Sequence, residues 1–484
     1  MKLKLLFILI PIFALSQTQI GSDINGEAAL DYFGTSVSLS SDGSIVAIGA
    51  SSGNNGNGDD SGNVRVFENQ SGSWVQIGTN INGINVDDQF GISVSLSANG
   101  NIVAIGAPSN NNGYVSVYQN QSNSWVQLGA NINGEAPLDF FGSSVSLSAD
   151  GSILAVGATG NNGNGNNSGH VRVYQNLSGS WVQIGADIDG EAANDRFGNS
   201  LCLSADGSIL AIGAVSNSGN GTNAGHVRVF QNQSGNWVQI GSDIDGEGPD
   251  NLFGESVSLS ADGSILAVGA ERNDGNGTNA GHARVYQNQS GNWIQIGTDI
   301  DGEAAVDYSG NSVSISSDGS ILAVGAPGND GNGSDSGHAR IYQNQSGNWV
   351  QIGPDIDGEA AGDFFGINLN ISSDGSTLTI GGIFNDGGGF DSGHVRIYDI
   401  SSLLSTNSFA EDIFNLTYDK EQQQLIVRLN NSSQLKQINI FTINGKQLLS
   451  IKENIISTNN ISKGIYIVEV ISESGKTAKK IIIN

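Results

Sequence analysis

The chain has 484 residues, with 69 Gly, 6 Pro and a single Cys. These numbers exclude a disulfide-stabilised scaffold, since Cys202 has no partner, and a collagen-like helix, since the glycines lack a three-residue period. Residues 17–400 hold eight arginines and no lysine against 40 acidic residues, a net charge of −32. So acidic a body excludes nucleic acid and anionic membranes as partners, because binding to either needs clustered Lys and Arg.

Residues 1–16 have the pattern of a signal peptide. Lys2 and Lys4 precede a short apolar run, and Ala14 and Ser16 are the small residues that signal peptidase needs. A permanent N-terminal anchor is the alternative, but the run is too short for a transmembrane helix and no later stretch reaches about 20 apolar residues. We expect the chain from Gln17 onward to leave the cytoplasm without a transmembrane segment.

Residues 17–400 consist of one unit repeated seven times. The pair Phe-Gly, or Ser-Gly in one unit, recurs at Gly-to-Gly steps of 57, 51, 56, 56, 56 and 56 residues. Each unit contains four short strands between turn residues, which in the fourth unit are residues 200–204, 209–214, 226–231 and 237–241. No helical periodicity appears in the units. Seven such units predict an all-β fold, a seven-bladed β-propeller with four-stranded blades.

The two ends of the repeat region predict how the ring closes. The seventh unit stops without its Trp-bearing strand, whereas residues 17–21 at the start of the chain match the strand at residues 349–353. We expect this N-terminal strand to complete the last blade and to cover both open edges. The alternative, an open solenoid, would carry polar caps at both ends.

The motif Phe-Gly, followed by Ser-Val-Ser-Leu-Ser and then Asp-Gly-Ser-Ile-Leu-Ala-Val-Gly-Ala, resembles the FG-GAP repeat. This repeat forms the blades of the integrin α-subunit propeller and of many bacterial surface proteins. The resemblance covers residues 17–400 and implies a propeller fold, which by itself does not determine function. Integrin blades carry a calcium loop between their first two strands; here that connection is only Ser260–Ser264, too short to surround an ion.

A second acidic motif, Asp-Ile-Asp-Gly-Glu followed by another Asp, precedes several Phe-Gly pairs. Calcium takes six to eight oxygen ligands, and alternating acids around a glycine turn can supply several of them. The alternative is a solvated turn in which Asp side chains bond to nearby backbone N–H groups. The candidate calcium ligands are Asp187, Asp189, Glu191 and Asp195; Asp243, Asp245, Glu247 and Asp250; Asp299, Asp301, Glu303 and Asp307; and Asp355, Asp357, Glu359 and Asp363.

No residues in the units indicate catalysis, and we expect no enzyme. The five histidines occupy the same position on five different units, which predicts local hydrogen bonds rather than one shared metal site. We expect Cys202, in an inner strand, to be a small core residue. The rival interpretation is a polysaccharide hydrolase or lyase, which a carboxylate pair that breaks the repeat on one blade would indicate. We identify no such pair.

After a linker at residues 401–412, residues 413–484 predict a small Ig-like β-sandwich with strands at 424–429, 437–442, 464–470 and 479–483. The strand Gly464-Ile465-Tyr466 and the basic-apolar end Lys479-Lys480-Ile481 resemble the type A C-terminal sorting domain of the type IX secretion system of Bacteroidetes bacteria. The resemblance implies the secretion machinery as a partner of residues 413–484. An ordinary accessory module is the alternative.

Together these features predict a secreted or cell-surface bacterial propeller that acts as a non-enzymatic binding or adhesion module. We expect an extracellular glycan or protein as its ligand. The Gly/Asn-rich loops between the second and third strands, such as residues 328–337, are the expected contact surface if they gather on one face. A passive structural surface protein is the third alternative.

Overall fold

The computed structural model describes residues 17–53, 60–109, 111–404, 414–420, 422–429, 434–442, 446–459, 461–472 and 475–483. The chain divides into two compact units, one ending at Leu404 and one beginning at Ser405. The expected signal peptide at residues 1–16 lies outside the described residues. Where the chain is described, none of its helices has the length and apolar character to cross a membrane.

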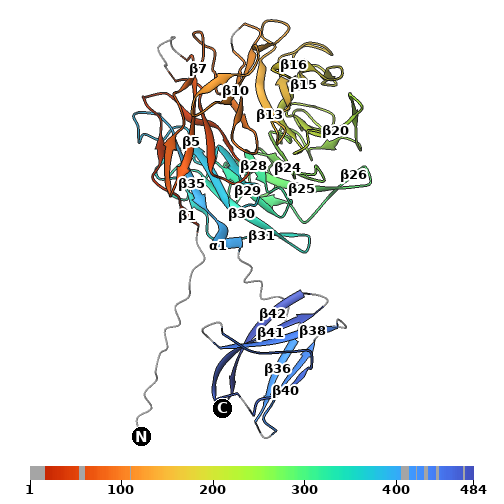
Figure 1. Ribbon diagram of the computed structural model, residues 1–484. Helices are drawn as coiled ribbons and strands as arrows, with labels where there is room; N and C mark the ends of the chain where they lie inside the picture. The colour runs from red at the N-terminus through yellow and green to blue at the C-terminus, as the bar shows by residue number, and fades with distance from the viewer. Residues whose placement is uncertain are drawn as a thin grey trace. The chain divides into compact units, whose positions relative to one another are not determined.

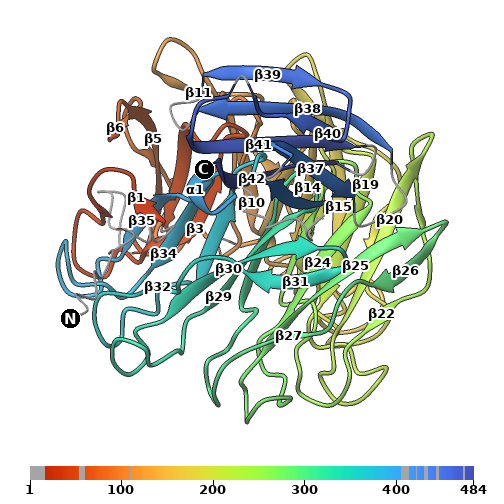
Figure 2. The same ribbon diagram turned by 90° about the horizontal axis from the view of Figure 1, so that it is seen from below.

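The first unit is a ring of seven antiparallel blades, as predicted (Figures 1 and 2). In the first blade, β3 (Phe33–Leu39) is innermost and pairs with β4 (Ile45–Ala50), which pairs with β5 (Asn63–Gln70). The fourth strand is interrupted, because β6 (Ser73–Gln76) and β7 (Ile81–Asn82) both pair with β5. Each blade therefore has four strand positions with a broken outer strand.

The other blades repeat this order. Their strands are β8 (Ser93–Leu96), β9 (Ile102–Ala107), β10 (Tyr114–Asn120), β11 (Trp125–Gln127) and β12 (Ile132–Asn133); β13 (Phe141–Leu147), β14 (Ile153–Ala158), β15 (His170–Leu177), β16 (Ser180–Gln183) and β17 (Ile188–Asp189); β18 (Phe197–Leu203), β19 (Ile209–Ala214), β20 (His226–Gln233), β21 (Asn236–Gln239) and β22 (Ile244–Asp245); β23 (Ser256–Leu259), β24 (Ile265–Ala270), β25 (His282–Gln289), β26 (Asn292–Gln295) and β27 (Ile300–Asp301); β28 (Ser312–Ile315), β29 (Ile321–Ala326), β30 (His338–Gln345), β31 (Asn348–Gln351) and β32 (Ile356–Asp357); and β33 (Asn368–Ile371), β34 (Thr377–Gly382) and β35 (His394–Asp399).

The N-terminal strand closes the ring. Strands β1 (Thr18–Gln19) and β2 (Ile24–Asn25) both pair with β35, so the start of the chain completes the seventh blade. In Figure 1 the red β1 lies beside the blue β35. The predicted closure is therefore confirmed, and the outer edge of β35 is paired rather than open.

The Phe-Gly pair holds neighbouring blades together. Phe33 is fully buried and shares an apolar cluster with Val46 and Ile48 of its own blade and Val395 of the seventh. Gly34 has φ +99°, and a Cβ there would lie 2.9 Å from the carbonyl oxygen of His394. The aromatic ring thus fills the space between two blades, and glycine permits their backbones to approach.

After β35 the chain forms a short helix, α1 (Ser401–Leu404), in which Leu403 is buried against the seventh blade. The first unit thus ends four residues beyond the predicted boundary at residue 400, inside the expected linker.

The second unit contains two antiparallel sheets that share one apolar cluster. The strand orders are β36-β37-β40 and β39-β38-β41-β42. The sequence predicts four of these strands, and β36, β39 and β40 are additional. Their bounds are β36 (Phe414–Asp419), β37 (Gln424–Leu429), β38 (Leu435–Thr442), β39 (Gln447–Ile451), β40 (Ile455–Ser457), β41 (Gly464–Ser472) and β42 (Gly475–Ile483).

Candidate functional site

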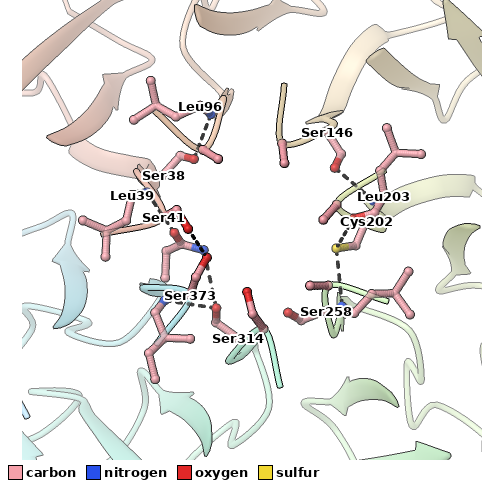
Figure 3. A pocket seen from close by; sticks show the side chains of 18 of the residues that line it. Ser38, Leu39, Ser41, Leu96, Ser146, Cys202, Leu203, Ser258, Ser314 and Ser373 are labelled. Carbon is pink, nitrogen blue, oxygen red and sulfur yellow. Dashed lines mark hydrogen bonds between the residues drawn. The ribbon is translucent and has the colours of Figure 1, made fainter. Parts of the chain in front are cut away.

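The inner strands surround a central channel with two different ends. At one end, which we call the hairpin mouth, the ends of all seven inner strands line a cavity of about 210 Å³ (Figure 3). Side chains there accept a backbone N–H from the next blade: Ser38 from Leu96, Ser146 from Leu203, and so on around the ring. Asn370 makes the bond that joins the seventh blade to Leu39 of the first, at 2.8 Å.

Backbone hydrogen bonds complete the hairpin mouth. One residue of each first hairpin donates its N–H to the carbonyl of the next blade's equivalent, and Ser373 donates to Ser41 to close the circle, at 2.8 to 2.9 Å throughout. Because serine and alanine recur here on nearly every blade, this mouth offers little that distinguishes one blade from another. We assign it to holding the ring together.

Cys202 lies at this mouth, half-buried, and packs against the edge of the apolar cluster that contains Leu259. It lies one residue after the core residue Leu201, so its equivalent on the fifth blade is Ser258 rather than Val257. Its Sγ accepts the N–H of Leu259 at 3.4 Å, as Ser258 accepts that of Ile315 at 3.1 Å. The thiol therefore takes over the role of a serine hydroxyl, and burial raises its pKa.

The predicted calcium ligands lie at the contacts between blades, where they meet arginines. Arg172 donates from Nε and Nη2 to the carboxylate of Asp187, at 2.9 and 2.8 Å, and also pairs with Glu135 from the turn before its blade. His170 Nδ1 lies 3.8 Å from Asp187. Burial raises the pKa of Asp187, but the hydrogen bonds from Arg172 and Gln183 outweigh it and lower that pKa overall.

Six of the seven blades carry an arginine at this position, paired with a glutamate from the preceding turn. The second blade has Ser116 in place of the arginine, and its preceding turn has Ile84 in place of the glutamate. The two partners are thus lost together. The Glu–Arg pairs are Glu27–Arg65, Glu135–Arg172, Glu191–Arg228, Glu247–Arg284, Glu303–Arg340 and Glu359–Arg396.

Within one turn the four predicted acids take different partners. In the third turn of the set, Asp299 bonds to Arg284 of its own blade and Glu303 pairs with Arg340 of the next. Asp307 is buried and accepts the N–H groups of Glu303 and Ala304, whereas Asp301 belongs to β27 and is exposed. The same division applies to the positions Asp187, Asp189, Glu191 and Asp195, where Asp189 is half-buried rather than exposed, and to Asp355, Asp357, Glu359 and Asp363.

The second turn of the set, which holds Asp243 and Asp250, departs from this arrangement. Asp250 is exposed and accepts a hydrogen bond from Asn223 at 3.0 Å, whereas the buried position belongs to the next residue, Asn251. Asp250 therefore does not occupy the position of Asp195, although the shared motif led us to expect it. Asp245 and Glu247 keep their places, whereas Asp243 accepts a hydrogen bond from Gln239 at 2.7 Å and lies 3.9 Å from His226 Nδ1. Glutamate, histidine and aspartate do converge, but from two successive turns, as in Glu247, His282 and Asp299.

These clusters do not fit a calcium shell. A guanidinium already bonds to the carboxylates of Glu247 and Asp299, and a divalent ion would have to displace the buried Arg284. The neighbouring imidazole is a poor calcium ligand. Burial and Arg284 lower the pKa of His282 to about 4, which leaves the ring neutral. The geometry favours the turn interpretation, with arginine as the resident cation.

The opposite end of the channel, which we call the loop mouth, has a constant backbone and variable side chains. Each blade begins with a turn X-Phe-Gly-Z, with Ser for Phe in the sixth, in which the N–H of Z donates to the carbonyl of X. Residue X is left-handed on all seven blades, with φ between 51° and 55°. X is Tyr32, Gln89, Phe140, Arg196, Leu252, Tyr308 or Phe364, and Z is Thr35, Ile92, Ser143, Asn199, Glu255, Asn311 or Ile367.

The variable residues divide the loop mouth into two arcs. The rings of Tyr32 and Phe364 each contact that of Phe384 edge to face, with centroids 5.4 and 5.3 Å apart. On the fourth and fifth blades, Arg196, Asn199, Asn223, Glu255, Glu271 and Arg272 line a cavity of about 490 Å³, which we call the Arg196–Arg272 pocket. Arg196 and Asn199 also line an adjoining cavity of about 340 Å³ with Phe140.

Charged groups of the Arg196–Arg272 pocket act on one another. Glu271 is 14% exposed, accepts a hydrogen bond from Asn311 at 2.6 Å and pairs with Arg272 at 3.4 Å. Burial, followed by repulsion from Glu271, raises the pKa of Glu255 to about 7, against the lowering effects of Asn199, Arg272 and Arg196. Near neutral pH this carboxyl can therefore serve as a hydrogen-bond donor or an acceptor.

This pocket was not predicted from the sequence, although it contains a carboxylate pair, Glu255 and Glu271, that breaks the repeat. At the position of Glu255 the other units have Thr, Ile, Ser, Asn, Asn and Ile, and at that of Glu271 they have Ser, Pro, Thr, Val, Pro and Ile. A comparison of the seven units position by position would have identified both residues. Their proximity follows from the pairing of β23 with β24.

Comparisons with known proteins bear on both units. The FG-GAP repeat model matches residues 25–67, 133–174, 242–286 and 298–342. The model of the secretion system C-terminal sorting domain matches residues 411–484. No curated protein sequence matches the chain.

Three solved structures are similar to this chain at low identity. Hydrazine synthase of Kuenenia stuttgartiensis is 13% identical with a TM-score of 0.49, over 77% of this chain and 95% of that one. The periplasmic gluconolactonase of Pseudomonas aeruginosa is 18% identical with a TM-score of 0.48, over 68% and 86%. The β-propeller domain of Cps50 (Swd1) from Myceliophteria thermophila is 13% identical with a TM-score of 0.49, over 78% and 99%.

Proposed function

Because this chain is an FG-GAP repeat β-propeller with a type IX C-terminal sorting domain, we propose that it is a binding module for an extracellular ligand, with the loop mouth as its contact surface. The sorting domain implies export to the cell surface or the extracellular space through the secretion machinery. We propose that residues 1–16 direct the earlier step across the inner membrane. Outside the cell, we propose, the propeller acts without catalysis, in adhesion to a glycan or protein.

One observation carries this proposal: the blades differ from one another where the loop mouth is formed. A constant X-Phe-Gly-Z turn presents different side chains on each blade, whereas the hairpin mouth repeats serine and alanine. Stability alone does not need such variety, since the identical backbone hydrogen bonds form on every blade. Exposed variable side chains on a rigid frame are typical of recognition surfaces.

The Gly/Asn-rich loops support this frame. In the sixth blade, Asn329 accepts the N–H of Gly331 at 2.8 Å, and the Asn332 amide donates to the carbonyls of Gly358 and Glu359 at 2.9 Å. These bonds tie the loop to the turn that leads into the next blade. We propose that the loops position the loop mouth and that the variable X and Z residues contact the ligand.

A glycan array probed with the chain from residue 17 tests the proposal. We expect a restricted set of glycans to bind, and a variant with Tyr308→Ala and Phe364→Ala to lose at least part of that binding. A matched control, Gln233→Ala with Asn236→Ala, changes exposed side chains of a hairpin on the opposite side and should bind as the unchanged chain does. No binding to glycans or to extracellular proteins would favour a passive structural role.

The carboxylate pair Glu255 and Glu271 supports a second candidate, a polysaccharide-acting enzyme. A neutral carboxyl beside an ionised one is the arrangement that glycoside hydrolysis uses. Release of new reducing ends from a polysaccharide, abolished by Glu255→Gln and by Glu271→Gln, would establish this activity. Binding without any release would leave the binding module as the function.

A further inference from the structure

The eight arginines of the propeller separate into two groups. Six of them, at positions 65, 172, 228, 284, 340 and 396, pair with glutamates between blades and are buried. The remaining two, Arg196 and Arg272, both break the repeat, and both line one pocket. Since no lysine occurs between residues 17 and 400, these two guanidinium groups are the cations of the propeller outside the contacts between blades.

The arrangement of the pocket leaves positive charge available to a ligand. The Arg272 side chain is 51% exposed, and Arg196 is exposed as well. The carboxylate of Glu271 accepts a hydrogen bond from Asn311 and pairs with Arg272, so both of its partners are side chains of the protein. In a body of net charge −32, two accessible arginines at one cavity form the most favourable place for an anionic group.

The other groups at the pocket suit a hydroxylated ligand. The amides of Asn199 and Asn223 combine donors and acceptors, as hydroxyl groups require. Phe140, 39% exposed, lines the adjoining cavity that shares Arg196 and Asn199, and offers an apolar face beside the polar groups. The two cavities together extend over neighbouring blades, as a chain-like ligand would need.

We propose that the Arg196–Arg272 pocket binds an anionic saccharide, whose carboxylate or sulfate group is held by the two arginines while its hydroxyl groups bond to Asn199, Asn223 and Glu255. This inference rests on the proposed binding function and names its ligand class. The acidic surface does not prevent such binding, because charges beyond about 8 Å are largely screened at physiological ionic strength. It does oppose polyanions such as nucleic acids, which need many phosphate contacts at once.

Isothermal titration of the chain from residue 17 tests the inference. The probes are oligogalacturonate, a sulfated galactan oligosaccharide and a neutral galactan oligosaccharide of equal length. We expect one anionic probe to bind and the neutral probe to bind at least tenfold more weakly. Preference for oligogalacturonate would identify a carboxylate as the recognised group, and preference for the sulfated probe a sulfate. Equal binding of the neutral probe would overturn the inference.

Variants assign the effect to the pocket. Arg196→Gln and Arg272→Gln should each lower the affinity for the anionic probe about tenfold, the loss expected when one charged hydrogen-bond partner is removed. Arg428→Gln removes the same charge from an exposed position of the second unit and should leave affinity unchanged. Equal losses in all three variants would overturn the inference, because they would indicate a general charge effect. Unchanged melting temperatures show that the variants are folded.

The outcome also separates this inference from the proposed function. Suppose that neutral glycans bind, that the double variant Tyr308→Ala with Phe364→Ala abolishes this binding, and that the arginine variants do not. The inference of an anionic-saccharide pocket would then be wrong, and the loop mouth would remain the binding surface. If no probe binds and neither glycans nor extracellular proteins bind to the chain, both are wrong.

Discussion

Glu255 shows how one side chain can cost stability for the sake of a binding surface. The other blades place neutral residues at its position, whereas here a carboxyl lies beside Glu271 in a partly buried pocket. Its pKa is raised to about 7 from an ordinary value of 4.5. The folded state therefore holds this proton more tightly than the unfolded chain, and stability falls as the pH rises from about 4.5 through 7.

We expect Glu255→Gln to stabilise the propeller at pH 8 by about 1 to 3 kcal/mol, since the variant has no carboxyl to ionise next to Glu271. At about pH 3 the gain should vanish, because the carboxyl is then protonated in both the folded and the unfolded state. Thermal unfolding at the two pH values measures the difference. An equal change at both would mean that Arg196, Arg272 and Asn199 already compensate the ionised charge.

Cys202 offers a second test at this scale. Because it aligns with Ser258 and accepts the N–H of Leu259, Cys202→Ser should change the free energy of unfolding by less than about 0.5 kcal/mol. Cys202→Val removes the acceptor and should cost about 1 to 2 kcal/mol. Denaturant unfolding compares the two variants. If valine were tolerated better than serine, Cys202 would be the core residue that the sequence led us to expect.

At the level of the structural elements, a similar arrangement of residues recurs at the contacts between neighbouring blades. A buried phenylalanine, a close backbone approach at glycine and a Glu–Arg–Asp bridge occur together at the contacts of Arg172, Arg284 and Arg396. The second blade replaces the bridge as a set, with Ile84, Ser116 and Asn131, whose side chain accepts a hydrogen bond from Ser116 at 2.8 Å. The chain thus contains its own uncharged version of the bridge.

This substitution can be transplanted to the fifth blade. We expect Arg284→Ser alone to cost about 3 kcal/mol or more, because it leaves the carboxylates of Glu247 and Asp299 without their partner. Adding Glu247→Ile and Asp299→Asn should recover most of that loss. Chemical denaturation measures the three free energies. A triple variant as unstable as the single one would show that the bridge is not exchangeable.

Calcium gives a further test of the same contacts. We expect the melting temperature of the chain from residue 17 to be the same in millimolar calcium and in chelator, because arginine already neutralises the acids. Isothermal titration should likewise show no heat of binding. A rise in melting temperature that Asp299→Asn abolishes would restore the calcium interpretation of these turns.

For the whole molecule, the decisive feature is that the ring is closed by its own first residues. Residues of β1 and β2 pair with β35, and the Trp74 indole donates to the carbonyl of Ile20 at 2.9 Å. The first and seventh blades are thereby joined by the hairpin mouth on the inside and by this strand on the outside.

Removal of residues 17–25 should therefore open an edge and lower the melting temperature by several degrees or more, because β35 loses its partners and Trp74 an acceptor. A chain that begins at residue 26 is compared with one that begins at residue 17 in thermal unfolding. Equal melting temperatures would mean that the hairpin mouth alone holds the ring. Self-association of the shorter chain would be a second sign of an open edge.

The sequence alone determined the local and periodic features. Strands follow from alternation and turn residues, the number of blades from the 56-residue period, and closure from the match of residues 17–21 to residues 349–353. Each of these features depends on residues that are close together in the sequence or on identity between the repeated units, and both can be counted in the sequence. The sorting domain, too, was identifiable from short motifs.

Only the tertiary structure decided which partner each charged residue takes. Glu135 meets Arg172, and Glu271 meets Asn311 of the next blade, because the ring brings blades into contact across 37 and 40 residues of sequence. A motif such as Asp-Ile-Asp-Gly-Glu therefore suggests one ion site, although its members point to different blades. Likewise Glu255, Glu271, Arg196 and Arg272 become one pocket because inner strands converge around the channel, a closeness that no local pattern contains.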